Sequence, residues 1–167
     1  MNFYIAAAIL IVGFLSRLVP HVWNFTPVLA LALFAGAYLP KRLMFAVPLV
    51  MMLLTDLILG FYPSIVVNWI AVLASVAVGM LLREKNSWMR LTACSFGAAV
   101  VFFLISNLGV WLTDYPKTWS GLADCYVLAL PFFRTSLAST LIYSYVLVGG
   151  YAWMLRRASS RVLTEKA

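Results

Sequence analysis

Charged side chains are scarce in this sequence of 167 residues: they make up 10% of it, and five of them are acidic. One histidine and two cysteines complete a small supply of groups that could act as catalysts or metal ligands. The sequence holds no Gly-x-Ser-x-Gly nucleophile motif, no His-Glu-x-x-His zinc motif and no cysteine pair with zinc spacing. We therefore expect a protein that is not an enzyme and that carries neither a metal nor a cofactor.

Soluble segments are lacking as well. No long polar linker and no low-complexity tract separates the apolar runs, so we expect one domain over residues 1–157 and a frayed basic tail over residues 158–167. Cys94 and Cys125 fall near opposite membrane faces in the topology derived below, and a disulfide between them would have to cross much of the bilayer. We therefore expect two free thiols.

Apolar residues are abundant instead, at 65% of the chain. A helix needs about 20 apolar residues to cross a hydrocarbon core about 30 Å thick. The sequence divides into six such runs, at about 3–19, 27–40, 43–61, 64–82, 91–112 and 131–155. The runs are continuous and lack the alternation of a membrane strand, so they predict helices. The expected fold is an all-α membrane protein with six transmembrane helices.

The basic residues predict the orientation. Nine of the twelve fall in alternate connections or after the last run: Lys41, Arg42, Arg83, Lys85, Arg90, Arg156, Arg157, Arg161 and Lys166. Because cytoplasmic loops carry an excess of Lys and Arg, we expect both termini in the cytoplasm of a bacterial cell, with the chain in the inner membrane. The net charge of +7 reflects this excess beside anionic lipid and gives no reason to expect a nucleic-acid partner.

The first apolar run resembles a secretory leader in length. It lacks a basic segment before it, and no small-residue cleavage site follows it. We expect it to be retained as the first membrane helix.

The polar groups that interrupt the apolar runs gather near the outer face in this topology. A charge at the centre of a membrane helix costs about 2.5–3.5 kcal/mol on insertion scales, so such groups usually serve a ligand or a partner. Asp56 is the clearest case, with Arg134 as its natural ion-pair partner and Arg17 as the second candidate. Such a pair could hold two helices together or orient a ligand at a cavity wall, and both readings stay open at this point.

The first outer connection is expected to contribute to the same site. Pro20 is expected to end the first helix, while Thr26 and Pro27 form a typical helix start. His21 and Asn24 lie between these signals. They could contact a ligand or belong to an interfacial aromatic belt with a capped turn.

The segment 119–131 is too short to cross a membrane and is followed directly by the last run. We expect it to form a short outer capping segment that lies over the bundle and turns in at Pro131. Cys125 would then lie near the mouth of a cavity. The full set of expected substrate-binding residues is Arg17, His21, Asn24, Asp56, Tyr62, Asn68, Asn107, Trp111 and Arg134.

Several motifs together resemble a bacterial family of small six-helix membrane proteins without a characterised function, over about residues 15 to 150. They are Arg17-x-x-Pro20-His21-x-x-Asn24-Phe25-Thr26-Pro27, Ala32-Leu33-Phe34-x-Gly36-Ala37-Tyr38, Asp56-Leu57-x-x-Gly60-Phe61-Tyr62, Asn107-x-Gly109-Val110-Trp111, Tyr115-Pro116-x-Thr118, Gly121-Leu122, Cys125-Tyr126 and Pro131-Phe132-Phe133. That family is similar in architecture to the S components of energy-coupling-factor transporters, the membrane subunits that capture vitamins and related micronutrients.

The resemblance implies a substrate cavity in the outer half of the bundle. It also implies a partnership with an energising module, made of a transmembrane subunit and two ATPases. Solitary S components for cobalamin look like the nearest guide, with His21, Asp56 and Arg134 at matching places and Asn68 where they have a cobalt-ligating cysteine. S components usually dock through a small-x-x-x-small pair on the first helix; the cleaner pair here is Ala32 with Gly36, on the second.

The expected function is thus substrate capture for the uptake of a vitamin-like nutrient. A structural or scaffolding membrane subunit without a ligand is the alternative. An enzyme acting at the outer face through His21 or Cys125 is a third and weaker hypothesis.

Overall fold

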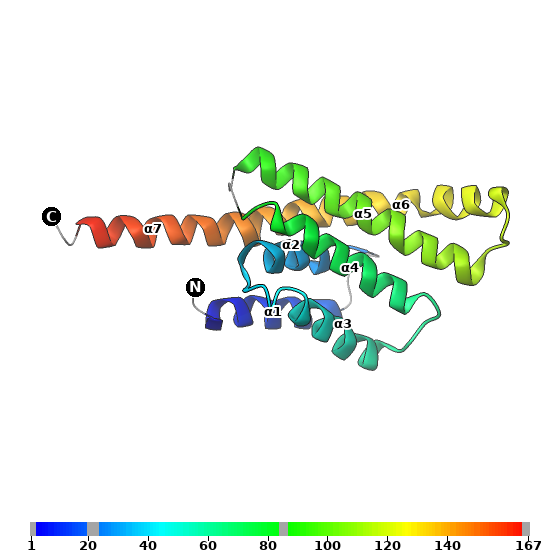
Figure 1. Ribbon diagram of the computed structural model, residues 1–167, viewed down its shortest axis with the longest axis horizontal. Coiled ribbons are helices and arrows are strands. Elements are labelled where there is room, and N and C mark those ends of the chain that lie inside the picture. The colour runs from blue at the N-terminus through cyan, green and yellow to red at the C-terminus, as the bar shows by residue number, and fades with distance from the viewer. Residues whose placement is uncertain (1–2, 20–23, 84–86, 165–167) are drawn as a thin grey trace.

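The computed structural model describes residues 3–19, 24–83 and 87–164, and all regular structure within these ranges is helical. The elements are α1 (Phe3–Leu18), α2 (Val28–Tyr38), α3 (Ala46–Leu59), α4 (Ile65–Met80), α5 (Trp88–Asp114), α6 (Trp119–Ser144), the π-helical turn η1 (Tyr145–Gly149) and α7 (Gly150–Thr164). Because α6, η1 and α7 follow one another without a break, the described chain forms six rods (Figure 1). The all-α class and the six helices are confirmed.

Successive rods run in opposite directions, so the connections fall at two ends of the bundle (Figure 1). The α3–α4 and α5–α6 connections lie at one end, which we call the distal end. The α2–α3 connection, the start of α1 and the end of α7 lie toward the other, which we call the terminal end. This grouping matches the alternation expected from the basic residues.

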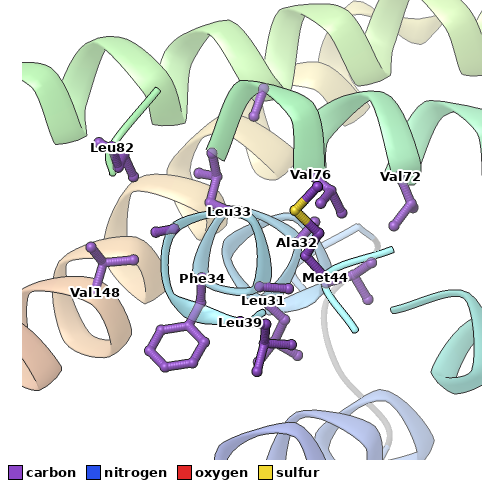
Figure 2. Packing of buried hydrophobic residues seen from close by; sticks show 14 of the residues in the cluster. Leu31, Ala32, Leu33, Phe34, Leu39, Met44, Val72, Val76, Leu82 and Val148 are labelled. Carbon is purple, nitrogen blue, oxygen red and sulfur yellow. The ribbon is translucent and has the colours of Figure 1, made fainter. Parts of the chain in front are cut away.

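Helix α2 forms the centre of the bundle. Ten of its eleven residues, Val28 to Ala37, are buried, and it contacts α1, α3, α4, α5, α6 and η1. Figure 2 shows Leu31, Leu33 and Phe34 pointing in different directions from this helix into the surrounding core. A helix that is apolar on every side is buried on every side.

Two glycines set the distance between α2 and α4. A Cβ added at Gly36 would lie 2.1 Å from the carbonyl oxygen of Val76, and one at Gly79 would lie 2.5 Å from that of Leu33. Both neighbours are backbone atoms, so the helices touch where the glycines face each other. The expectation that Ala32 and Gly36 form a docking surface is therefore wrong, because both residues are buried against other helices of the same chain.

Two helices of the described chain are long and apolar enough to cross a membrane: Trp88–Asp114 and the segment Trp119–Arg157 of the long rod. By themselves, two such helices indicate a membrane protein only weakly. The expectation of six full-length spans is met in part, since α2, α3 and α4 have 11, 14 and 16 residues.

The prediction of a separate outer capping segment is wrong. Residues 119–131 are the first half of α6, which continues through Pro131 to Ser144. The side chain of Thr118 accepts a hydrogen bond from the backbone N–H of Gly121 at 3.1 Å and so starts the helix there. Proline removes one donor from a helix interior, and this long helix accommodates that loss without ending.

The remaining boundaries agree with the sequence in part. Helix α1 ends at Leu18, close to the stop expected from Pro20. Helix α2 begins directly after Pro27, but no side chain caps it, so Thr26 does not have its expected role. The backbone remains helical to Thr164, where a frayed tail was expected. Cys94 and Cys125 are free, as predicted, and both are buried.

Candidate functional site

A cavity of about 340 Å³ opens at the distal half of the bundle, among α2, α4, α5 and α6. Its described lining is Arg17, Asn24, Thr26, Val28, Leu29, Met52, Tyr62, Asn68, Val72, Phe102, Phe103, Ser106, Asn107, Val110, Ala129, Phe132, Phe133, Ser136 and Ser139. Five of the nine residues expected to bind substrate are in this lining: Arg17, Asn24, Tyr62, Asn68 and Asn107. They come from four separate parts of the chain.

Arg17 is the one charged residue in the described lining, and two residues of α3 bind its guanidinium. Its Nη2 donates to Oδ1 of Asp56 at 2.7 Å, and its Nη1 donates to the hydroxyl of Thr55. The Thr55 hydroxyl bonds in turn to the carbonyls of Met51 and Met52, in the preceding turn of α3. These contacts fix the guanidinium at the end of α1 against the cavity.

Asp56 lies behind the wall rather than in it. Its side chain is 1% exposed, and its second oxygen accepts a hydrogen bond from the indole N–H of Trp69 at 2.7 Å. The expected pairing with Arg134 is wrong: Arg17, the second candidate, takes that place, and Arg134 is exposed on α6. The carboxylate therefore neutralises and positions Arg17.

Tyr62 and Asn68 form the α3–α4 side of the cavity. The side-chain amide of Asn68 donates to the Tyr62 hydroxyl at 2.9 Å. Burial raises the pKa of Tyr62 above its ordinary 10.0 and Asp56 raises it further, while the Asn68 hydrogen bond and Arg17 act in the opposite direction. The hydroxyl thus keeps its proton at neutral pH, while its oxygen accepts the hydrogen bond from Asn68.

Asn107 lies on the α5 side with Ser106. Its amide nitrogen donates to the carbonyl of Phe103, one turn earlier in the helix, at 2.7 Å. This bond holds the Asn107 side chain against its own helix at the cavity wall. Behind this wall the buried thiol of Cys125 contacts the Asn107 carbonyl at 3.5 Å, so Cys125 packs against α5.

Helix α6 supplies a wall that the sequence reasoning missed. Ala129, Phe132, Phe133, Ser136 and Ser139 line the cavity at helical spacing. Four hydroxyl residues, Ser136, Ser139, Thr140 and Ser144, form a buried stripe on this helix, and that spacing was the available signal. It is a weak signal, because serine and threonine often bond to their own helix, as Ser139 and Thr140 do here.

The α1–α2 connection reaches the cavity through Asn24 and Thr26. Asn24 has a positive φ of 60°, a conformation that asparagine tolerates better than most residues. Its carbonyl accepts a 3.4 Å hydrogen bond from Ser139, which ties the connection to α6. His21 lies outside the described residues.

Trp111 and Arg134 are not in the described lining. The indole N–H of Trp111 donates to the carbonyl of Pro116 at 3.0 Å, and Lys117 lies over its ring. Trp111 therefore holds the turn between α5 and α6.

The described lining of this cavity combines neutral polar groups, aromatic rings and one cation. Amide, hydroxyl and phenol groups alternate with the rings of Phe102, Phe103, Phe132 and Phe133, and the single cation already has a buried counter-ion. The described residues contain no group of three His, Cys, Asp or Glu side chains that could hold a metal ion.

A family model described as a family of unknown function, DUF6580, matches residues 1–163. No curated protein matches the chain. No solved structure matches it either.

Proposed function

Because the chain belongs to the DUF6580 family, whose description assigns no function, we propose from its cavity that it is a membrane-embedded subunit that captures a small nutrient for uptake. In this proposal it works as an S component does in an energy-coupling-factor transporter. The convergence of five sequence-predicted polar residues on one cavity carries the proposal.

Two observations support the proposal that the protein is embedded in a membrane. The helices Trp88–Asp114 and Trp119–Arg157 are long and apolar enough to span a bilayer. Large apolar side chains are also exposed along the outer surfaces of the rods, among them Leu54 and Ile58 on α3, Leu104 on α5 and Val127 on α6. Soluble monomers rarely expose wide apolar surfaces, whereas a lipid-facing surface consists of them.

The short helices are compatible with this placement. Helix α2 is roughly 16 Å long, about half of a hydrocarbon core. It is enclosed by the other rods and needs no lipid contact.

The cavity also suggests the class of ligand. Its volume of about 340 Å³ is at the lower end of the range of about 300–1,000 Å³ found for small-molecule pockets. Aromatic walls favour a planar or ring-containing body, and the neutral polar groups favour a ligand with several hydrogen-bonding atoms. This supports a vitamin-like compound of one or two rings over a corrinoid, which is far larger.

Filling the cavity tests the proposal. Ala129 lies in the lining and is 8% exposed, so Ala129→Phe should occupy ligand space without removing a polar group. Ala123→Phe, at an exposed position of the same helix, is the matched control. Small molecules that survive gentle purification, and those retained from a panel of vitamins, are identified by mass spectrometry.

We expect a specific compound with the wild type and with Ala123→Phe, and at least a tenfold loss with Ala129→Phe. Equal retention by the wild type and both variants would place the ligand outside this cavity. If none retains any compound, capture is refuted.

A scaffolding subunit is the second candidate, because Asp56 is fully satisfied by Arg17 and Trp69 without any ligand. It predicts that the exchanged pair Arg17→Asp with Asp56→Arg regains the stability that each single change loses, and that no small molecule is retained. If the double variant recovers its stability but no longer retains the ligand that the wild type retains, capture is favoured. A scaffold would need only the restored ion pair.

A further inference from the structure

A second cavity, of about 310 Å³, lies at the terminal end of the bundle. Its lining shares no residue with that of the distal cavity. Its lining is Ser87, Trp88, Gly149, Ala152, Trp153 and Arg156, from the start of α5 and from the η1–α7 part of the long rod.

Local structure builds the aromatic wall of this cavity. Trp88 stacks on Tyr145 with ring centroids 5.4 Å apart and an interplanar angle of 21°. Its ring also lies against Gly149, where an added Cβ would come within 2.8 Å of Trp88 Cζ3. The π-helical turn Tyr145–Gly149 inserts one residue into the rod and brings both positions to the same side as Trp88. Such turns occur frequently at functional sites.

The one charged residue in the described lining of this cavity is basic. Arg156 lies in the lining, is exposed, and makes no hydrogen bond or ion pair with another described residue. The guanidinium of the neighbouring Arg157 lies 4.0 Å from the ring centroid of Trp153. The acidic residues of the described chain, Asp56, Asp114 and Asp124, lie toward the distal end of the bundle, and none of them lines this cavity.

We propose that this cavity binds the head group of an anionic phospholipid. The phosphate would contact Arg156, and the glycerol backbone would lie between Trp88 and Trp153. Tryptophan rings occupy the level of lipid head groups in membrane proteins, and basic pockets between helices at the membrane face recognise acidic head groups. Trp88 and Trp153 are 61% and 54% exposed, so the cavity is open toward the side from which lipid would enter.

Removing one charge at a time tests this site. The full-length protein is purified in detergent and titrated with phosphatidylglycerol or phosphatidylcholine, and bound lipids are counted by native mass spectrometry. Arg156→Gln removes the proposed contact, while Arg42→Gln removes an exposed charge in the α2–α3 connection at the same end. A basic residue near a membrane surface contributes about 1 kcal/mol, or roughly fivefold, to diffuse attraction of anionic lipid.

A seated head group predicts that Arg156→Gln weakens phosphatidylglycerol binding at least tenfold more than Arg42→Gln does, with no change for phosphatidylcholine. Equal losses in the two variants would show diffuse attraction only and would overturn the site. Equal binding of the two lipids by the wild type would also overturn it. Competition by millimolar glycerol phosphate as effective as that by the lipid would assign the cavity to a soluble phosphate instead.

This inference rests on the membrane placement in the proposed function, and the two can fail separately. A chain that leaves the membrane fraction in alkaline carbonate would refute both. Equal binding of the two lipids by a wild type that still retains a ligand in the distal cavity would refute the lipid site alone.

Discussion

Asp56 stabilises and orients the partly buried guanidinium of Arg17. Removing a carboxylate and a guanidinium from water is costly, and only a close pair with further hydrogen bonds offsets that cost. Here Trp69 and Thr55 supply those bonds, and the cation reaches the cavity with its orientation fixed. Loss of either partner leaves the other charge buried alone.

We therefore expect Asp56→Ala to lower the free energy of unfolding by about 3–5 kcal/mol, with a similar effect for Arg17→Met. The double variant should lose less than the sum, because neither partner is then left unpaired. Denaturant unfolding in detergent measures all three. Arg134→Met, at an exposed site, should stay within about 0.5 kcal/mol of the wild type; additive losses in the double variant would show that the pair is not coupled.

The raised pKa of Tyr62 predicts that the wild type and Tyr62→Phe differ in stability at high pH. Because burial, the largest effect, raises its pKa above 10.0, the unfolded chain releases this proton at a lower pH than the folded chain does. The stability linked to this group is complete below the ordinary pKa and is lost as the pH rises through the raised pKa. Between pH 9 and 11, on the scale of about 10 for free tyrosine, the wild type should lose more stability than Tyr62→Phe. Parallel pH curves for the two proteins would contradict a raised pKa.

The sequence identified Asp56 as a buried charge but ranked Arg134 ahead of Arg17, its actual partner. A carboxylate in an apolar run must find a cation, and that requirement can be read from composition. Which of two arginines lies nearest depends on helix neighbours, which no local pattern specifies. Asn68 and Asn107 were found because they interrupt apolar runs, and Asn24 and Tyr62 because they lie in outer connections. Ser136 and Ser139 resembled ordinary helix serines.

At the scale of elements, the contact of α2 with α4 depends on two glycines. Gly36→Ala should lower the free energy of unfolding by about 1–3 kcal/mol or more, because its Cβ meets backbone at 2.1 Å and the helices must separate. Gly97→Ala on α5 is the control, since its Cβ would meet only Val78 at 3.9 Å. There the change should be neutral or stabilising by about 0.5–1 kcal/mol, because alanine favours helix. Thermal unfolding compares them, and equal effects would contradict the tight contact.

Pro131 offers a test of the continuous α6. In a helix interior, Pro131→Ala restores a backbone donor and removes a ring clash, so stability should be unchanged or higher by up to about 3 kcal/mol. If residues 119–131 were a separate cap that turns in at Pro131, the substitution would instead lower stability. Thermal unfolding, with the helix content followed by circular dichroism, separates these outcomes.

Helix type was predictable for every run, whereas helix length was not. Continuous apolar runs predict helices because their backbone must be satisfied internally. The length rule assumes contact with lipid, and α2 departs from it because it is enclosed by other rods. The Pro131 boundary failed because a proline weakens a helix locally without deciding whether the surrounding segments stay aligned.

At the scale of the whole molecule, the alternating connections predict which end faces which side of the membrane. In a chain whose two buried cysteines are replaced by alanine, Phe61→Cys at the distal end should react with a membrane-impermeant maleimide in intact cells. Lys41→Cys at the terminal end should react only after permeabilisation. Reaction of both in intact cells, or the reverse pattern, would contradict the orientation.

The long rod from Trp119 to Thr164 has a consequence for mechanics. At 1.5 Å per residue it is roughly 70 Å long, about twice a hydrocarbon core. One end forms a wall of the distal cavity, the middle forms the terminal cavity, and α7 extends past the other helices (Figure 1). In a straight rod of this length, a slight tilt at the distal cavity would displace Thr164 by a larger distance, and the π-helical turn lies between these two points.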